Sequence, residues 1–146
     1  MTTRKYPKRP WVSAHAIIFD QHRRILLVKR AAPPKQNFWF PPGGAIDVGE
    51  TVKSGLEREI LEETNVTVKN MNFVDYIDGI TQDTEGQILY HFVVFMFVAD
   101  YLEGTIKAKD DALEVRWVSL EEIMTNALPV PKELITILER LHIEEC

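Results

Sequence analysis

The segment at residues 88–99 constrains the fold more than any other part of this sequence. Apolar residues occupy both alternating faces of the β-strand that it predicts. Such a strand must be covered on both sides, because either bare face would expose apolar surface to water. We therefore predict a central strand that lies between two layers.

The remaining pattern predicts an α/β fold around that strand. Further β-prone runs, separated by polar or glycine-containing turns, occur at residues 11–19, 25–28, 66–77, 105–109 and 113–118. Helices are expected after Thr51, after the capping box that Ser119 opens, and from Pro131 onwards. Strands, one helix, strands and then two helices predict a mixed sheet between helices.

The helix expected after Thr51 crowds carboxylates on one face. Glu59, Glu62 and Glu63 stand three and four residues apart, so their side chains lie together. Each like-charged pair at this spacing costs roughly 0.2–0.5 kcal/mol even in solvent. A hard divalent cation would offset the repulsion, and Mg²⁺ suits a substrate that brings its own phosphates. A solvated acidic helix face is the alternative interpretation.

These residues resemble the Nudix box, G-x5-E-x7-R-E-U-x-E-E-x-G-U, in which U is aliphatic. Gly44, Glu50 and residues 58–66 stand at the matching positions, and the aromatic-Pro-Pro-Gly-Gly run that ends at Gly44 resembles the entry to this box. Asn65 stands where the family has glycine. Because Asn adopts positive φ more readily than other non-glycine residues, the helix can still end there.

The resemblance implies an α/β/α sandwich and hydrolysis of a nucleoside diphosphate linked to another group X, with Mg²⁺ or alternatively Mn²⁺ as cofactor. Glu59 and Glu63 are then the expected principal metal ligands. Glu62 is expected as a ligand or the general base, and Glu50 as a ligand directly or through water. Arg58, four residues before Glu62, is expected to hold the carboxylates in place.

The resemblance also implies a further acidic group from a loop outside the box. The candidates, in order, are Asp111, Glu114 and Asp110, with a solvated acidic loop as the alternative. Lys29 and Arg30, at the end of a predicted strand, are candidates to meet substrate phosphates or simply to keep that strand end soluble.

Three residues before and within the box are further candidates for substrate binding. Gly43 and Gly44 allow the backbone to pass close to a ligand. Trp39 is a candidate for stacking on a nucleobase, with core packing as the alternative. Asp47 is interpreted as a residue that stabilises the turn.

The substrate is less constrained by the sequence. Residues 90–94 and 110–118 resemble ADP-ribose-pyrophosphatase-type Nudix proteins, although neither the proline that marks some of them nor the tyrosine that marks diadenosine-polyphosphate hydrolases is found at residues 80–84. We favour ADP-ribose or a similar nucleotide sugar. A MutT-type nucleoside triphosphate pyrophosphohydrolase and a non-catalytic nucleotide-sensing module are the alternatives, and the complete set of carboxylates favours an enzyme.

Length and charge limit the remaining classes. The 146 residues predict one domain over 1–146, with residues 1–10 as a flexible tail. A net charge of −5 argues against nucleic acid and anionic membrane as partners. Cys146 is the only cysteine, so no intrachain disulfide can form, and no 18-residue apolar run occurs. We expect a cytoplasmic monomer or homodimer.

Overall fold

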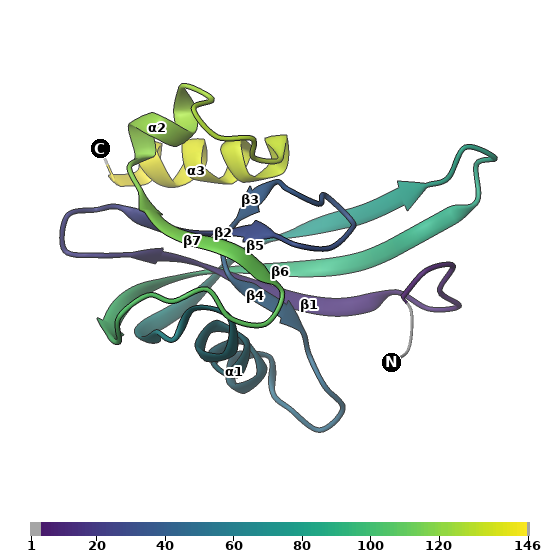
Figure 1. The fold of residues 1–146 in the computed structure, drawn as a ribbon, viewed down its shortest axis with the longest axis horizontal. Coiled ribbons are helices and arrows are strands. Elements are labelled where there is room, and N and C mark those ends of the chain that lie inside the picture. The colour runs from purple at the N-terminus through teal and green to yellow at the C-terminus, as the bar shows by residue number, and fades with distance from the viewer. Residues whose placement is uncertain (1–3, 146) are drawn as a thin grey trace.

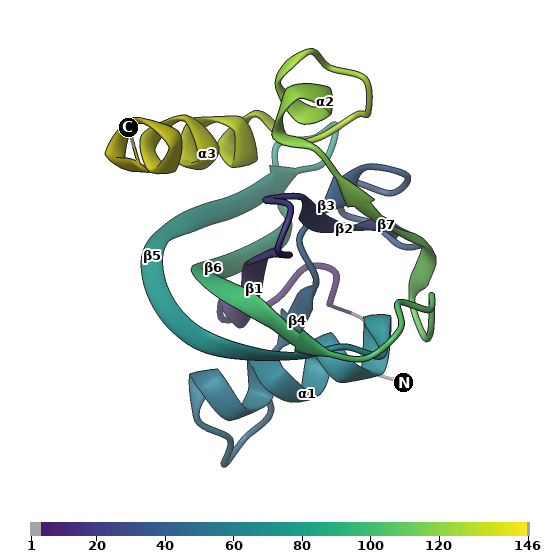
Figure 2. The same ribbon diagram turned by 90° about the vertical axis from the view of Figure 1, so that its left-hand side faces the viewer.

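A seven-stranded sheet separates α1 from α2 and α3 in the computed structural model, which describes residues 4–145 (Figures 1 and 2). The elements are β1 (Trp11–Phe19), β2 (Ile25–Arg30), β3 (Trp39–Phe40), β4 (Gly43–Ala45), α1 (Val52–Thr64), β5 (Thr67–Gln82), β6 (Ile88–Glu103), β7 (Ala112–Val118), α2 (Leu120–Met124) and α3 (Lys132–Glu145). Cys146 and residues 1–3 of the predicted tail lie outside the described residues.

The sheet is mixed, as predicted. Its strand order is β3-β2-β1-β6-β5, with β4 paired to β1 and β7 paired to β2. β6 runs parallel to β1 and antiparallel to β5, and the other pairs are antiparallel. The predicted central strand is confirmed, because β6 lies between β1 and β5.

Two apolar cores cover the opposite faces of the sheet. On one face, Ile17 and Met96 belong to a core that includes Leu134 and Leu138 of α3. On the other face, Ala16 and its neighbours pack with α1. Alternation along β1 and β6 therefore supplies both layers, which is the α/β/α sandwich that the sequence predicted.

Apart from β3 and β4, which were not expected as strands, two segments differ from the sequence-based expectation. Residues 78–82, which lie beyond the strand expected at residues 66–77, continue β5, because they pair with β6 as far as Gln82. No strand forms at residues 105–109. Instead, the Lys107 and Lys109 amides donate to the Thr64 and Glu63 carbonyls at 3.0 Å each. This segment thus satisfies carbonyl groups that the end of a helix otherwise leaves without a partner.

The hairpin formed by β5 and β6 projects beyond the rest of the sheet (Figure 1). We call its outer part, residues 77–94, the arm. Tyr6, which belongs to the predicted tail, contacts this arm. The Tyr6 amide donates to the Leu89 carbonyl at 2.8 Å, and the Tyr6 hydroxyl donates to Asp83 at 2.9 Å. Within the described part of the chain, no helix has the length and apolar character that a membrane span needs.

Candidate active site

Local interactions define both ends of α1, and its buried residues define which side of the helix faces the sheet. The Thr51 side chain accepts a hydrogen bond from the Ser54 amide at 3.1 Å, as expected for an N-cap. Asn65 ends the helix in the left-handed conformation, with φ of 67°, as the departure from the box predicted. Leu56 and Ile60 are fully buried, so the next stripe of the helix faces β4.

Arg58 is the centre of the charged cluster. Its Nε and Nη2 donate to the two oxygens of Glu50 at 2.7 and 2.9 Å. Its Nη1 donates to both Glu59 and Glu62 at 3.1 Å, which places these two carboxylates side by side. Asp47 completes the cluster at 3.3 Å, and its amide donates to Glu50. Hydrogen bonding to Arg58 lowers the pKa of Glu50 to about 2.

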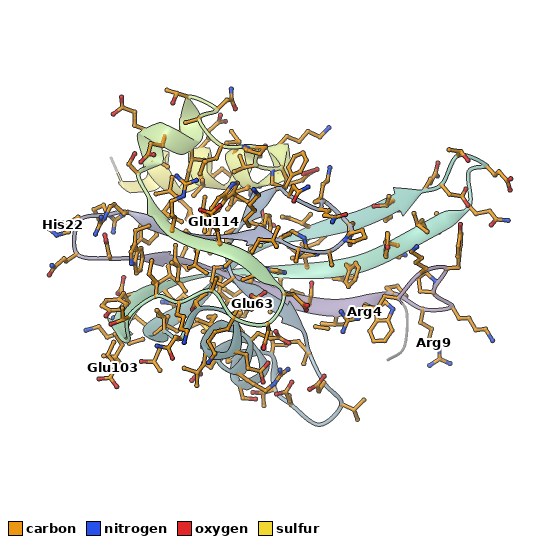
Figure 3. The ribbon with its side chains drawn as sticks, in the orientation of Figure 1. Arg4, Arg9, His22, Glu63, Glu103 and Glu114 are labelled. Carbon is orange, nitrogen blue, oxygen red and sulfur yellow. The ribbon has the colours of Figure 1, made fainter. Side chains whose placement is uncertain are left out.

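Glu63 lies apart from Arg58 and faces β4. Its carboxylate accepts the Gly43 amide at 2.9 Å. Burial raises the pKa of Glu63 to about 7. The Gly43 hydrogen bond opposes that rise, whereas the negative charges of Glu59 and Asp111 add to it. Figure 3 labels Glu63 in the middle of the molecule, where α1 passes the start of β7.

Close approach requires glycine at residue 43, and a side chain at residue 44 would displace the carboxylate of Glu59. A Cβ at Gly43, where φ is 155°, would overlap the Ala14 carbonyl oxygen. A Cβ at Gly44 would lie 2.6 Å from the carboxylate of Glu59. Burial raises the pKa of Glu59 and its pairing with Arg58 opposes the rise. The backbone of β4 therefore touches two acidic side chains of α1 that are partly shielded from water.

Arg30 and Asp111 lie beside this pair. Glu63 and Asp111 both act electrostatically on Arg30, whose pKa is lowered by burial. The Arg30 Nε donates to the Pro34 carbonyl at 2.9 Å, and its Nη atoms donate to no protein oxygen among residues 4–145. Asp111 is anchored because its carbonyl accepts the Ala31 amide at 3.0 Å.

A cavity of about 600 Å³ joins these groups to the arm. One end is polar and is lined by Arg30, Glu59, Glu63 and Asp111. The other end is lined mainly by side chains of β5 and β6. This size lies within the range of about 300–1,000 Å³ that is usual for small-ligand sites.

Several predicted site residues lie outside the cavity lining. Glu50 and Glu62 do so, and both are paired with Arg58. Trp39 is only 3% exposed, with the Arg116 guanidinium 4.6 Å from its ring centroid, so it packs in the core. Of the remaining candidates, Lys29, Asp110 and Glu114 do not line the cavity either.

Sequence reasoning missed His15 and Arg4, which both line the cavity. The signal for His15 was its place as the one ionisable side chain inside the apolar run at residues 11–19. Its Nδ1 donates to the Pro41 carbonyl at 2.8 Å, and burial lowers its pKa to about 4. Arg4 gave no signal beyond its charge.

The polar end is suited to a hard cation. Within the described part of the chain, no set of three or more His, Cys, Asp or Glu side chains already stands in a metal-binding arrangement. Yet Glu59 and Glu63 present carboxylate oxygens to one cavity, and the charge of Glu59 raises the pKa of Glu63. Oxygen donors that repel one another fit Mg²⁺ better than any soft metal.

A family model described as the NUDIX domain matches residues 9–141. The chain belongs to the NUDIX domain family. A solved MutT NUDIX hydrolase from Burkholderia pseudomallei superposes on it with a TM-score of 0.77 at 26% identity, over 90% of this chain and 98% of that one. The NUDIX fold predicted from the box is therefore confirmed.

The chain also resembles two named enzymes in sequence. The ADP-ribose pyrophosphatase of Methanocaldococcus jannaschii is 32% identical over 114 residues, which cover 78% of this chain and 64% of that protein. The oxidized purine nucleoside triphosphate hydrolase of Mus musculus is 28% identical over 114 residues, which cover 73% of this chain and 65% of that protein. The chain thus spans less than two thirds of each relative.

Proposed function

We propose that this NUDIX protein hydrolyses the pyrophosphate of a nucleoside diphosphate linked to X, with ADP-ribose or a similar nucleotide sugar as substrate and Mg²⁺ as cofactor. One observation carries the proposal: Glu59, Glu63 and Arg30 meet at one end of a single cavity. A pyrophosphate needs both kinds of group, because its oxygens bind to cations and to guanidinium donors.

Each residue of the polar end receives a role. Glu59 and Glu63 hold the cation, and Glu62, whose carboxylate lies beside that of Glu59, stays the predicted further ligand or general base. Bound Mg²⁺ supplies neutralisation of phosphate charge and a lower pKa for water. Arg58 positions the carboxylates and pairs with both oxygens of Glu50, which stays a predicted ligand directly or through water.

Arg30 and Asp111 complete the proposed machinery. The Nη groups of Arg30 are left to donate to phosphate oxygens, since its Nε is held by Pro34. Asp111 is the acidic group from outside the box that can take the proton of the attacking water. Water adds to one phosphorus, and the bond from that phosphorus to the bridging oxygen breaks. ADP-ribose would give AMP and ribose 5-phosphate.

The choice of substrate rests on similarity to named relatives. The Methanocaldococcus jannaschii relative bears the name ADP-ribose pyrophosphatase, which supports ADP-ribose. The mouse relative and the Burkholderia pseudomallei structure support the MutT-type alternative, cleavage of a nucleoside triphosphate to a monophosphate and pyrophosphate. The two functions differ in products, which chromatography separates.

The test combines a substrate panel with one matched pair of variants. We expect Glu63→Gln to lower kcat on the best substrate by roughly two orders of magnitude or more while the folded state persists. Glu57→Gln, on the exposed side of the same helix, should keep wild-type turnover. Near-normal turnover by the Glu63 variant would refute the site.

The panel separates the candidate functions. Brisk triphosphate cleavage without ADP-ribose cleavage would replace the preferred substrate by the MutT-type one. If no nucleotide were cleaved although Mg²⁺ raised the melting temperature, the non-catalytic sensing module would be the correct function.

A further inference from the structure

Three cross-strand pairs of the arm line the cavity. They are Ile77 with Val94, Gly79 with Phe92, and Thr81 with Tyr90. Residues directly opposite each other in antiparallel strands share one face of the sheet. The middle pair therefore presents a phenyl ring opposite a position that has no side chain, and side chains border this gap on both sides.

The backbone does not require glycine at residue 79. Its φ is outside the positive region in which Gly43, Gly49, Gly86 and Gly104 lie. A Cβ built there meets Phe92 O at 3.4 Å, Phe92 Cβ at 3.6 Å and Val94 Cγ2 at 3.8 Å, which are ordinary contacts. Glycine inside a strand weakens it and often marks a place where another group approaches closely. The feature that an added side chain would change is the space over Phe92.

The ring of Phe92 is partly exposed and lines the cavity. It is half-buried, and within residues 4–145 no stacked or edge contact joins it to another aromatic ring. Tyr90, two residues before Phe92, is 6% exposed and so forms the base of the cavity at this end. Apart from Asp78, the arm residues that line the cavity carry no charge.

The two ends of the cavity differ in chemistry accordingly. Arg30 and the carboxylates gather at one end, whereas the gap at Gly79 is aromatic, with Asp78 and Arg4 as the charged residues of the lining near it, since Arg4 lies over Trp11, the β1 partner of Phe92. A nucleotide has the same polarity, since its phosphates are charged and its base is a flat neutral ring that stacks on aromatic side chains.

We propose that the gap at Gly79 seats the nucleobase of the substrate, which stacks on Phe92 between Ile77 and Thr81. This inference rests on the proposed function, because it assigns the base end of the same site. It makes Gly79 a specificity-determining residue: bulk at position 79 excludes the base and leaves the phosphate end intact.

The experiment compares wild type with Gly79→Ala and Gly79→Val as a graded series, and with Phe92→Leu, which keeps apolar bulk but removes the ring. Val93→Ile adds a methylene on the opposite face of β6, outside the cavity lining, and serves as the matched control. Direct binding of AMP and of ribose 5-phosphate is measured by calorimetry for each variant, together with kcat, KM and the melting temperature.

We expect Gly79→Val and Phe92→Leu to weaken the binding of AMP by about tenfold and to raise KM by a similar factor, with kcat nearly unchanged. Gly79→Ala should have a smaller effect, and ribose 5-phosphate should bind equally to all variants. The melting temperature of Gly79→Val should not fall, because a β-branched residue suits a strand.

Equal AMP binding by wild type, Gly79→Val and Phe92→Leu would overturn the inference, and so would a wild type that binds no nucleoside monophosphate. An equal loss of AMP and ribose 5-phosphate would also overturn it, since the effect would then not be specific to the base. Turnover by the wild type tests the proposed hydrolase separately. A hydrolase with unchanged AMP binding in Gly79→Val would keep its function and lose this base site.

Discussion

Acid should destabilise this protein through His15. That side chain is 7% exposed, its Nδ1 donates to Pro41 at 2.8 Å, and its ring meets the Phe40 ring edge-on at a centroid distance of 4.9 Å. Burial lowers the pKa of His15 from 6.5 to about 4, and the nearby charge of Arg30 acts in the same direction. The folded state therefore keeps this imidazole neutral at pH values where the unfolded chain takes up a proton.

The sign and size of the effect follow from proton linkage. Above pH 6.5 the histidine is neutral in both states and costs nothing. As the pH falls from 6.5 towards 4, only the unfolded state binds the proton, so the free energy of unfolding decreases. Each pKa unit is worth about 1.36 kcal/mol, so the loss approaches about 3 kcal/mol, of which about 2.5 kcal/mol should be reached at pH 4.5.

Urea unfolding of the metal-free protein at pH 7 and pH 4.5 measures this loss. His15→Gln removes the titrating group and keeps an amide that can donate to Pro41. Other carboxyl groups titrate in both proteins and cancel in the comparison. His22→Gln, in the exposed turn after β1, controls for losing a histidine as such. Wild type and His22→Gln should therefore lose about 2.5 kcal/mol more than His15→Gln.

A parallel loss of stability in all three proteins would refute the reasoning. It would mean that His15 titrates alike in the folded and unfolded chain, and hence that it is not held neutral by burial.

Three further predictions concern the polar end of the cavity. Arg58→Lys cannot pair with both oxygens of Glu50 and also reach Glu59, so kcat should fall by about tenfold or more in steady-state assays with saturating Mg²⁺, and an unchanged kcat would contradict its positioning role. Gly44→Ala places a Cβ 2.6 Å from the Glu59 carboxylate, so the Mg²⁺ concentration for half-maximal activity should rise, whereas an equal requirement would show that Glu59 does not hold the metal. EDTA should abolish turnover, and Mg²⁺ at 100 times its Kd should stabilise the folded protein by about 2.7 kcal/mol in thermal melts, an effect that Glu63→Gln should reduce.

Local rules predicted the carboxylate helix well. The N-cap at Thr51, the left-handed end at Asn65 and the common face of the glutamates all depend on neighbours within a few residues. The orientation of each carboxylate was not predictable in the same way. Arg58 shares its donors among several acids, and only the packed structure decides that Glu50 is held by both oxygens while Glu63 faces the cavity.

Longer-range pairing explains the segments that sequence reasoning missed. Residues 105–109 have the alternation of an edge strand, but their amides bond to the end of α1 instead of a strand. Residues 78–82 have the polarity of a loop, yet they lie at an exposed sheet edge, where polar side chains do not prevent strand pairing. The cavity wall formed by the arm follows from that second pairing, so it was invisible in the local pattern.

The hydrogen bond of the Lys109 amide determines where the chain can accept an insertion. Because this amide donates to the Glu63 carbonyl, the segment that leads to Asp111 is held against the last turn of α1. Glu63 and Asp111, which are 48 positions apart in the chain, are thereby held in a fixed relative position by the backbone. An insertion at residues 105–109 would break this backbone connection and should abolish activity. A linker placed in the turn at residues 20–24, which Asp20 closes by itself, should leave the chemistry untouched.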